Sequence, residues 1–320
     1  MTTPLRVAVA GVGGIGKHHA KWYSQWGCEV VAFTGTTPAR CDRAAETLAD
    51  LFGFAGRSYT DLGTLLAEER PHIVDVCTPN EQHLAFAAEA LRAGCHVLCE
   101  KPLTWQPQDV EHLHEAERLV QLARDRNLSF AVSTQYAAAI PHYDQLFRMS
   151  AAGPAEVMEL SVEMETLSRG RVRDSREIWI DLGPHPLSLL LAWMPEGWID
   201  HATLEAEFES RQVEVRFDFQ AGKNRCHCHL VVRDIESGSP RRRFGINGFI
   251  VDVAGRNGEN GVYEAVLRHG EQEAVCPDFM SSLIRQFIET VKGEEPAPLV
   301  PASLGLRNME LQLQILDACR

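Results

Sequence analysis

A lysine stands directly after a short apolar run, in the tripeptide Glu100-Lys101-Pro102 that follows residues 95–99. The run has the length and composition of a buried strand. Ligands of open α/β sheets bind in the crevice beyond the carboxyl ends of the strands, so Lys101 would present an ammonium group at the mouth of such a site. It could touch a substrate, a cofactor or both. The plain alternative is a surface lysine that ends a strand.

A second pair of candidate residues, Asp181 and His185, lies farther along the chain. Pro184 and Pro186 flank the histidine and mark the first turn of a helix that continues to Met194. Histidine suits proton transfer because its ordinary pKa is near physiological pH, and the positive end of a helix favours the neutral ring that accepts a proton. Asp181 could orient this ring or contact a substrate hydroxyl. The plain alternatives are a helix cap for Asp181 and a satisfied core histidine for His185.

A glycine-rich turn follows the first apolar run, residues 7–10, near the start of the chain. Its spacing fits the dinucleotide fingerprint, in which one glycine permits the tight turn, one admits the pyrophosphate and one packs the helix on the strand. These three roles fall to Gly11, Gly13 and Gly16, with Gly14 and Ile15 between them. The helix that opens here would aim free N–H groups at the phosphates, so we expect a bound dinucleotide.

The next strand indicates which dinucleotide is bound. About 20 residues beyond the glycines, an NAD site usually places an acidic side chain on the ribose 2′-hydroxyl. Here that position falls in Thr34-Gly35-Thr36-Thr37, which contains no carboxylate. A 2′-phosphate would meet no repulsion, and Thr36, Thr37 and Arg40 offer donors, unless they merely form a turn. We therefore predict NADP as the preferred cofactor and NAD as the alternative.

Ordered motifs along nearly the whole chain resemble the glucose–fructose oxidoreductase and inositol dehydrogenase (Gfo/Idh/MocA) family. After the glycine turn, the motifs that carry the resemblance are Thr78-Pro79-Asn80-x-x-His83, Ala93-Gly94-x-x-Val97, Glu100-Lys101-Pro102, Asp181-x-Gly183-x-His185 and the closing helix from Gly305 to Asp317. Three departures concern the substrate more than the reaction. They are residues 176–180 in place of a frequent glycine run, Ser188 in place of a frequent aspartate, and residues 134–137, which lack a frequent arginine.

The resemblance implies a Rossmann domain, a C-terminal domain whose open sheet often forms an oligomer interface, a tightly held nicotinamide cofactor and a sugar, cyclitol or related substrate. Lys101 would match the active-site lysine, and Asp181 and His185 the pair from the second domain. The expected cofactor contacts are Gly11, Gly13, Gly14, Ile15, Gly16, Thr36, Thr37, Arg40, Thr78, Pro79, Asn80, His83, Glu100, Lys101 and Pro102.

The elements that must position these residues follow from hydrophobic periodicity. Alternating strands and helices over residues 1–130 predict a doubly wound parallel sheet, and turn-separated strands over residues 131–320 predict a largely antiparallel open sheet in an α+β domain. The expected strands of the first domain are 6–10, 29–34, 73–78, 96–100 and 129–133, with helices over 15–26, 38–51, 61–70, 82–93 and 107–126. In the second domain strands are expected over 156–165, 203–209, 212–219, 224–233, 249–254 and 264–268, and a closing helix over 302–319 that could pack back on the first domain.

Composition excludes several functional classes. The 320 residues carry a formal net charge of −13, which disfavours nucleic acid and anionic membranes as partners. The longest apolar stretch of a predicted helix, 187–194, is too short to span a bilayer. No signal peptide precedes the first strand, and nine scattered cysteines are typical of reduced thiols, so we expect a cytoplasmic protein.

Two clusters of potentially reactive side chains remain. Arg169, Arg171, Arg173 and Arg176 could contact an anionic substrate or pair with acidic residues. The run from Cys226 to His229 alternates Cys and His, which a strand would divide between its two faces, and we expect no metal site there or elsewhere.

Together these features predict an oxidoreductase that transfers hydride between a nicotinamide cofactor and a secondary hydroxyl or ketone of a sugar-like substrate. His185 would move the proton, and Lys101 would polarise the reacting oxygen. The alternatives are a catalytically silent NAD(P)-binding sensor and a reductase of a non-sugar carbonyl or imine. We also expect a homodimer or homotetramer that forms through the C-terminal sheet.

Overall fold

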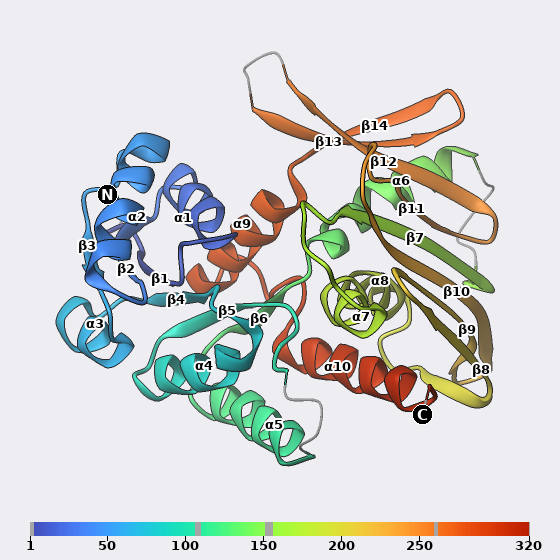
Figure 1. The fold of residues 1–320 in the computed structure, drawn as a ribbon, viewed down its shortest axis with the longest axis horizontal. Coiled ribbons are helices and arrows are strands. Elements are labelled where there is room, and N and C mark those ends of the chain that lie inside the picture. Colours follow the sequence, from blue (N-terminus) through green and yellow to red (C-terminus); the bar gives the residue numbers. More distant parts are fainter. Residues whose placement is uncertain (1–2, 106–109, 151–155, 259–261, 320) are drawn as a thin grey trace. The chain divides into compact units, whose positions relative to one another are not determined.

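The computed structural model describes residues 3–105, 110–150, 156–258 and 262–319. The chain forms two compact units. The first contains Met1–Ser133 and Met280–Leu306, and the second contains Thr134–Phe279 and Arg307–Arg320 (Figure 1). The predicted domain boundary at residue 130 lies three residues before the division at Ser133. The return of residues 280–306 to the first unit differs from the predicted division.

The first unit is built on a six-stranded parallel sheet in the order β3-β2-β1-β4-β5-β6. Its strands are β1 Arg6–Ala10, β2 Glu29–Thr34, β3 Arg57–Tyr59, β4 Ile73–Val76, β5 His96–Glu100 and β6 Phe130–Ser133. Because the order reverses direction at β1 and β4, the crevice for a ligand lies beyond their carboxyl ends. This doubly wound sheet confirms the predicted fold class of the N-terminal domain.

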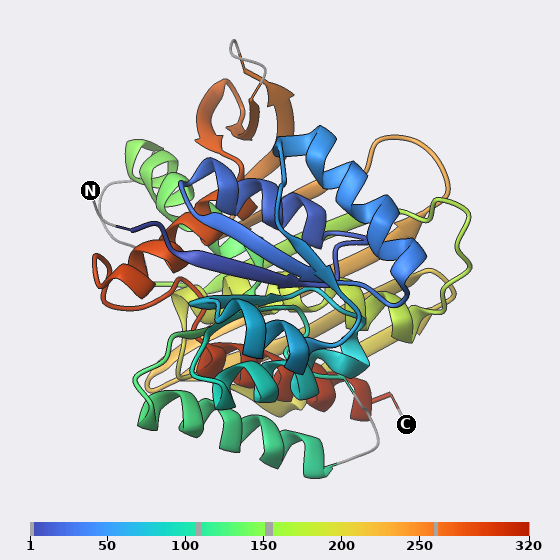
Figure 2. The ribbon, with the colours of Figure 1, turned by 90° about the vertical axis from the view of Figure 1, so that its left-hand side faces the viewer.

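Helices cover both faces of this sheet. They are α1 Gly16–Gln25, α2 Pro38–Phe52, α3 Leu62–Glu69, α4 His83–Arg92 and α5 Val110–Asp125, with a short 3₁₀ helix η1 at Asn80–Gln82. Figure 2 shows α1 and α2 on one face and α4 and α5 on the other. Pro107, the expected start of the last of these helices, lies outside the described residues.

A late helix completes the core of the first unit. This helix, α9 (Phe279–Lys292), packs Met280, Leu283, Ile284, Phe287 and Ile288 into the same core cluster as buried side chains of β1, α1 and α2. The five positions follow the helical spacing i, i+3, i+4, i+7 and i+8, so one apolar stripe faces the core. Burial of this stripe explains why residues 280–306 belong to the first unit.

The second unit is built on an eight-stranded sheet in the order β14-β13-β12-β11-β7-β10-β9-β8. Strands β7 and β10 pair in parallel, and the other neighbours pair antiparallel. Its strands are β7 Glu159–Leu167, β8 Trp198–Glu209, β9 Gln212–Ala221, β10 Asn224–Ile235, β11 Arg242–Ile246, β12 Phe249–Asn257, β13 Tyr263–His269 and β14 Gln272–Pro277. The largely antiparallel open sheet confirms the predicted second fold class.

The helices of this unit are η2 Gln135–Ala139, α6 Ile140–Ser150, α7 Ser175–Leu182, α8 Pro184–Trp193 and most of α10 Ala302–Asp317. The sequence predicts a closing helix over 302–319 that could pack back on the first domain. Residues 302–306 do belong to the first unit, but from Arg307 onward α10 belongs to the second. There Asn308 donates to the carbonyl of Pro184, and the Trp179 indole donates to the carbonyl of Gln312.

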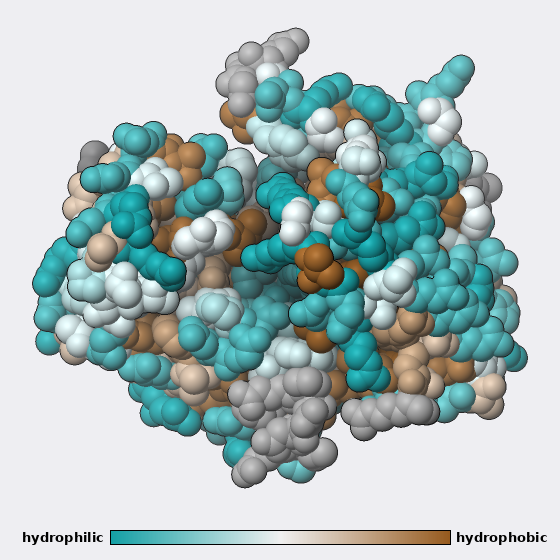
Figure 3. All heavy atoms as spheres, viewed as in Figure 1, coloured by the Kyte–Doolittle hydropathy of each residue, from teal (hydrophilic) through white to brown (hydrophobic). Residues whose placement is uncertain are grey.

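Among the described residues, no helix has both the length and the apolar composition needed to cross a membrane. In the view of Figure 3, hydrophilic side chains cover most of the surface, and hydrophobic ones occur in small groups. In β10, Cys226 and Cys228 are buried, whereas His227 and His229 pair with Asp218 and Glu214 on the other face.

Candidate active site

Two positions of the glycine turn between β1 and α1 have no room for a side chain. Gly11 has φ +89°, and a Cβ there would lie 2.7 Å from the carbonyl oxygen of Cys77. A Cβ on Gly16 would lie 2.1 Å from the carbonyl oxygen of Gly11. These contacts require glycine, because a left-handed turn and close packing of helix on strand both exclude a Cβ.

The other two glycines of the turn face open space. A Cβ on Gly13 or Gly14 would meet no atom within 4 Å. The residue before α1, Ile15, supplies no side-chain cap for the helix. The backbone N–H of His18 donates to the carbonyl of Ile15. No side chain of the turn caps the start of α1, and the bare backbone at Gly13 and Gly14 lets a pyrophosphate approach it.

A cavity of about 560 Å³ opens on this turn. It extends past the carboxyl end of β2 to the segment between β4 and α4. Its lining residues are Gly11, Val12, Gly13, Gly14, Thr34, Gly35, Thr36, Arg40, Ala44, Thr60, Leu62, Cys77, Thr78, Pro79, Gln82 and Phe86. This size lies within the range of small-molecule and cofactor sites, and the lining combines apolar side chains with hydroxyls, an amide and one cation.

Arg40 is the one charged side chain among the described residues that line the cavity. Its guanidinium donates to the hydroxyl of Thr36 over 3.2 Å. Thr37 instead caps α2, because its hydroxyl accepts the backbone N–H of Arg40 over 3.3 Å. The loop after β2 thus presents a cation and a hydroxyl to the cavity, and no acid among the described lining residues opposes them.

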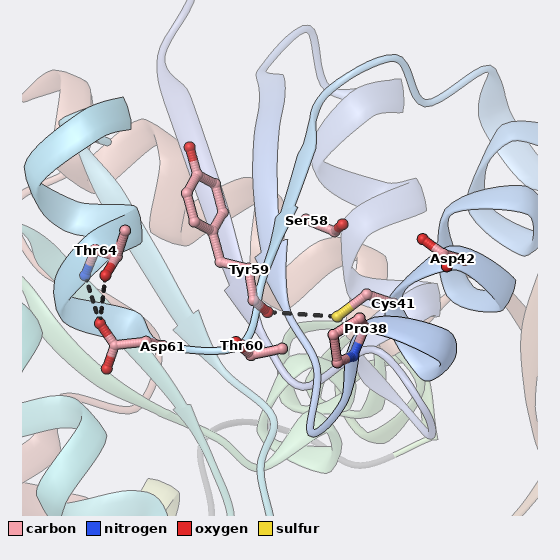
Figure 4. A pocket seen from close by; sticks show the side chains of 8 residues that line it. All are labelled: Pro38, Cys41, Asp42, Ser58, Tyr59, Thr60, Asp61 and Thr64. Atoms are coloured by element: carbon pink, nitrogen blue, oxygen red, sulfur yellow. Dashed lines mark hydrogen bonds between the residues drawn. The ribbon is translucent and has the colours of Figure 1, made fainter.

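A smaller hollow of about 290 Å³ shares Thr60 with this cavity (Figure 4). The Cys41 thiol lines this hollow and donates to the carbonyl of Tyr59 over 3.5 Å. Asp61 on its wall accepts the backbone N–H and the hydroxyl of Thr64, both over 2.7 Å. These bonds lower the pKa of Asp61, so its carboxylate is committed to capping α3.

The segment after β4 carries the predicted residues Thr78, Pro79, Asn80 and His83. Thr78 and Pro79 line the cavity. The ring of His83 is fully buried, with Nδ1 2.7 Å from the Pro102 carbonyl oxygen and Nε2 2.9 Å from the Thr78 carbonyl oxygen. His83 therefore fastens the cavity wall to the segment that follows Lys101.

Lys101 lies where the sequence predicts it, directly beyond the carboxyl end of β5. Its side chain is partly buried, and its peptide bond to Pro102 is cis. Its backbone N–H donates to Oε2 of Glu100 over 3.3 Å. Burial by itself would raise the pKa of Glu100, but the hydrogen bond and charge of His19, with Lys101 and Ser133, lower it to about 2. Glu100 is thus a buried carboxylate beside the candidate lysine.

The second unit carries Asp181 in the last turn of α7 and His185 in the first turn of α8. Gly183 joins the two helices, and a Cβ there would lie 2.6 Å from the carbonyl oxygen of Trp179. The His185 ring is buried and meets Tyr136 edge-on at 5.1 Å between centroids. These two helices, rather than a loop and one helix, position the candidate pair.

Arg173 holds Asp181 from the preceding segment. Its Nη1 lies 2.7 Å from Oδ2 of Asp181, and its Nη2 lies 3.1 Å from Oδ1 of the buried Asp234. Burial lowers the pKa of Arg173, but the hydrogen bonds to both carboxylates outweigh this and raise it. Of the four clustered arginines, this one pairs with acidic residues, as one of the two sequence hypotheses supposed.

The structure gathers part of the predicted set around one cavity. Gly11, Gly13, Gly14, Thr36, Arg40, Thr78 and Pro79 line it, whereas Ile15, Gly16, Thr37, Asn80, His83, Glu100, Lys101 and Pro102 are not among its described lining residues. Lys101 belongs to the first unit, and Asp181 and His185 belong to the second. Several lining residues are not among the predicted cofactor contacts, and Thr60, Cys77 and Phe86 are examples. Thr60 and Cys77 directly follow β3 and β4, so the rule of carboxyl strand ends could have found them.

Comparison with known proteins identifies the first unit. Residues 5–134 match the family model for the "Oxidoreductase family, NAD-binding Rossmann fold" (GFO_IDH_MocA). D-glucoside 3-dehydrogenase of Escherichia coli is 35% identical over 138 residues, which are 42% of this chain and 38% of that protein. UDP-N-acetylglucosamine 3-dehydrogenase of Acidithiobacillus ferrooxidans is 34% identical over 128 residues, which are 40% of this chain and 36% of that protein. The chain thus spans well under half the length of these curated relatives.

Solved structures resemble the fold over nearly the whole chain. The GnnA structure of the Acidithiobacillus enzyme has a TM-score of 0.72 at 21% identity, and covers 99% of this chain and 98% of its own. An inositol dehydrogenase homolog of Azotobacter vinelandii complexed with NAD+ has a TM-score of 0.73 at 19% identity, and covers 99% and 96%. Over residues 5–134 the chain is thus similar to the NAD-binding Rossmann domain of the Gfo/Idh/MocA oxidoreductases, and over nearly its whole length it shares their fold.

Proposed function

We propose that the protein is an NADP-preferring dehydrogenase that interconverts a secondary hydroxyl and a ketone on a sugar, cyclitol or related substrate. The observation that carries this proposal is the cavity on the glycine turn, where bare backbone at Gly13 and Gly14 adjoins Thr36 and Arg40. A dinucleotide fits these residues because the N–H groups of α1 suit its phosphates and the apolar wall suits its base. The names of the two curated relatives support a sugar hydroxyl as the reacting group.

The preference for NADP rests on charge. Arg40 is the one charged side chain among the described lining residues, and a guanidinium matches a phosphate in geometry as well as charge. An acidic side chain at this place would instead accept a ribose 2′-hydroxyl and repel a 2′-phosphate. The loop after β2 has hydroxyls and a cation there, so the 2′-phosphate is the better partner.

The chemical roles are divided between the two units. The bound nicotinamide supplies the hydride donor or acceptor. Lys101 polarises the substrate oxygen as negative charge develops on it, and His185 takes or returns the hydroxyl proton. Asp181, held by Arg173, orients the substrate hydroxyl or the imidazole ring. We also propose a cytoplasmic homodimer or homotetramer that associates through the second sheet.

Cofactor choice is tested by fluorescence titration with NADPH and NADH. We expect tighter binding of NADPH, and Arg40→Ala should raise its Kd on the order of tenfold, the effect of losing one charge-assisted hydrogen bond, while the Kd of NADH changes little. Arg43→Ala, an exposed neighbour on α2, is the control and should change neither Kd. Equal binding of the two cofactors by the parent would overturn the NADP assignment.

Catalysis is tested with a panel of sugars, sugar acids, nucleotide sugars and cyclitols in the presence of NADP+ or NAD+. Turnover on at least one of them is expected, and Lys101→Met should abolish it while the cofactor still binds. Lys223→Met, an exposed lysine of the second unit, should keep parental turnover. Cofactor binding without turnover on the whole panel would instead favour the silent sensor, and reduction of open ketones or imines would favour the non-sugar reductase.

A further inference from the structure

A buried ionic cluster lies inside the first unit, between helix α1 and the sheet. His19 of α1 is fully buried, and both of its ring nitrogens face carboxylates. Its Nδ1 lies 2.8 Å from Oδ2 of Asp75, and its Nε2 lies 3.2 Å from Oε1 of Glu100. Asp75 belongs to β4 and Glu100 to β5, so one imidazole ring joins a helix to two central strands.

The ring must carry two protons to satisfy both partners. A neutral imidazole has one N–H and would turn a lone pair toward the second carboxylate, whereas the protonated ring donates to both. Two buried carboxylates without a cation would also be very costly. Burial lowers the pKa of His19, but Asp75 and Cys77 outweigh it and raise that pKa well above its usual value.

Other titratable groups face the cluster without supplying this cation. The Cys77 thiol donates to Oδ1 of Asp75 over 3.2 Å, and burial raises the pKa of Cys77. Burial and the nearby Asp75 likewise raise the pKa of Tyr23 on α1. Cys99 of β5 is buried, and its pKa is raised as well. These groups remain neutral, so His19 and Lys101 are the cations beside Asp75 and Glu100.

The cluster could also be taken for a metal site, because ligand atoms of His19, Asp75 and Cys77 lie within 4.8 Å of one another. The separation of 2.8 Å between Nδ1 and the carboxylate oxygen is that of a hydrogen bond, however. A shared proton therefore accounts for the closest contact in the cluster.

The cluster reaches the candidate site at both ends. Oε1 of Glu100 lies at the ion-pair distance of 3.2 Å from Nε2 of His19, and Oε2 accepts the backbone N–H of Lys101 over 3.3 Å. At the other end, Asp75 accepts the thiol of Cys77, which lines the cofactor cavity. One carboxylate thus connects a helix that begins at the cofactor turn to the backbone of the candidate lysine.

We propose that protonated His19 is a positioning residue, which locks the Glu100 carboxylate and through it fixes Lys101 relative to the cofactor cavity. The proposal deepens the proposed function and rests on it for its kinetic consequence. It assigns His19 no contact with substrate or cofactor. The loss of His19 should therefore reduce kcat far more than it changes the Kd of NADPH.

The first test is a double-mutant cycle in turnover with a substrate that the panel identifies. His19→Gln and Glu100→Gln should each lower kcat, on the order of 100-fold for a misplaced catalytic group, with little change in the Kd of NADPH. Because both act through one contact, the double variant should be no slower than the slower single variant. His96→Gln at the opposite end of β5 is the matched control and should keep parental kcat. Multiplied losses in the double variant would overturn the proposal.

The second test needs no substrate, and its first measurement needs no variant. In ¹⁵N spectra of the histidines of the parent protein, His19 should show two protonated ring nitrogens up to pH 8. The chain has five lysines, at positions 17, 21, 101, 223 and 292, so ¹³C-methylation gives few signals. The signal of Lys101 should move in His19→Gln and not in His96→Gln. A singly protonated His19 at pH 7, or stoichiometric zinc in the purified protein, would overturn the proposal.

These outcomes separate the two proposals. If no substrate is turned over but His19 is doubly protonated and coupled to Lys101, the proposed function fails and the positioning of Lys101 stands. If turnover is found but the two effects multiply, the function stands and His19 has another role.

Discussion

Each unit places one cation between two carboxylates, but the two arrangements differ in burial. In the first unit His19 and Asp75 are fully buried and Glu100 is 11% exposed. In the second, Arg173 lies between the buried Asp234 and Asp181, whose side chain is 42% exposed. Arg211 adds a second cation 3.6 Å from Asp234. The first cluster, His19 with Asp75 and Glu100, has little access to water. In the second cluster, Arg173 with Asp181 and Asp234, water can replace the contact to Asp181.

The difference indicates what each cluster can do. A buried pair is costly to break because the remaining charge has no water, so it holds its geometry firmly. A partly exposed pair contributes little to stability, and its members can exchange partners with solvent or a ligand. We therefore infer that His19 and Glu100 keep one fixed geometry, whereas Asp181 can exchange its partner.

The largest expected effect comes from removing the buried cation. His19→Ala leaves Asp75 and Glu100 without their shared cation and should lower the free energy of unfolding by about 3–5 kcal/mol. Urea denaturation followed by circular dichroism measures this, with the exposed His201→Ala as a control that should change little. A loss below about 1 kcal/mol would show that the first cluster is no firmer than an exposed pair.

The second largest effect should come from acid, which should reduce the contribution of the first cluster to the free energy of unfolding. The pKa of Glu100 is lowered to about 2, so its contribution is full above its unfolded value of 4.5 and is lost as the pH falls from 4.5 toward 2. The pKa of His19 is raised, so its contribution is full below 6.5 and is lost only as the pH rises through its higher folded value. Between these limits both partners carry their charges.

Unfolding curves from pH 2 to pH 7 measure this prediction. The difference in unfolding free energy between the parent and Glu100→Gln should shrink by about 3 kcal/mol over the acid range, since one pKa unit corresponds to about 1.4 kcal/mol. A difference that stays constant across this range would contradict the pairing of Glu100 with His19.

The sequence predicts the first cluster less well than the strands that carry it. The hydrophobic runs give β4 and β5, and the glycine turn gives the start of α1, so the backbone of this region follows from periodicity. Glu100 is predicted from the sequence as a cofactor contact, and no pattern in the sequence relates it to His19 or Asp75. Hydrophobic periodicity does not indicate which side chain pairs with a charged residue inside an apolar strand. That pairing depends on how the helix packs on the strands.

The sequence predicts fewer of the elements in the rest of the chain. Arg242 and Arg243 begin β11, which lies between β7 and β12 inside the sheet, although three consecutive arginines are typical of a solvated segment. Arg243 lies 3.7 Å from Asp252 of the next strand, so cross-strand partners accommodate the charge. Helix α9 is not among the predicted elements, and its apolar stripe packs into a core with residues of β1, α1 and α2, which lie more than 200 positions earlier in the chain.

A smaller effect is expected from the second cluster. Arg173→Met leaves the buried Asp234 with Arg211 alone and removes the partly exposed ion pair with Asp181, so the free energy of unfolding should fall by about 2 kcal/mol. The exposed Arg171→Met is the matched control and should change it little. A loss as large as that of His19→Ala would remove the contrast between the two clusters.

The smallest effect should come from the cap of the helix that carries Asp181. Asp174 accepts the backbone N–H of Glu177 over 2.8 Å, and Glu177 accepts the backbone N–H of Asp174 over 3.0 Å, which forms a capping box at the start of α7. Asp174→Ala should lower the free energy of unfolding by about 1 kcal/mol, and Asp174→Asn, which can still cap, by less.

This variant also tells which contact positions Asp181, because the cap holds the helix whereas Arg173 holds the carboxylate itself. If Arg173 is the main constraint, Asp174→Ala should leave KM for the substrate near the parental value, and Arg173→Met should raise it. A larger rise in KM for Asp174→Ala than for Arg173→Met would mean that the helix, and not the ion pair, sets the place of Asp181.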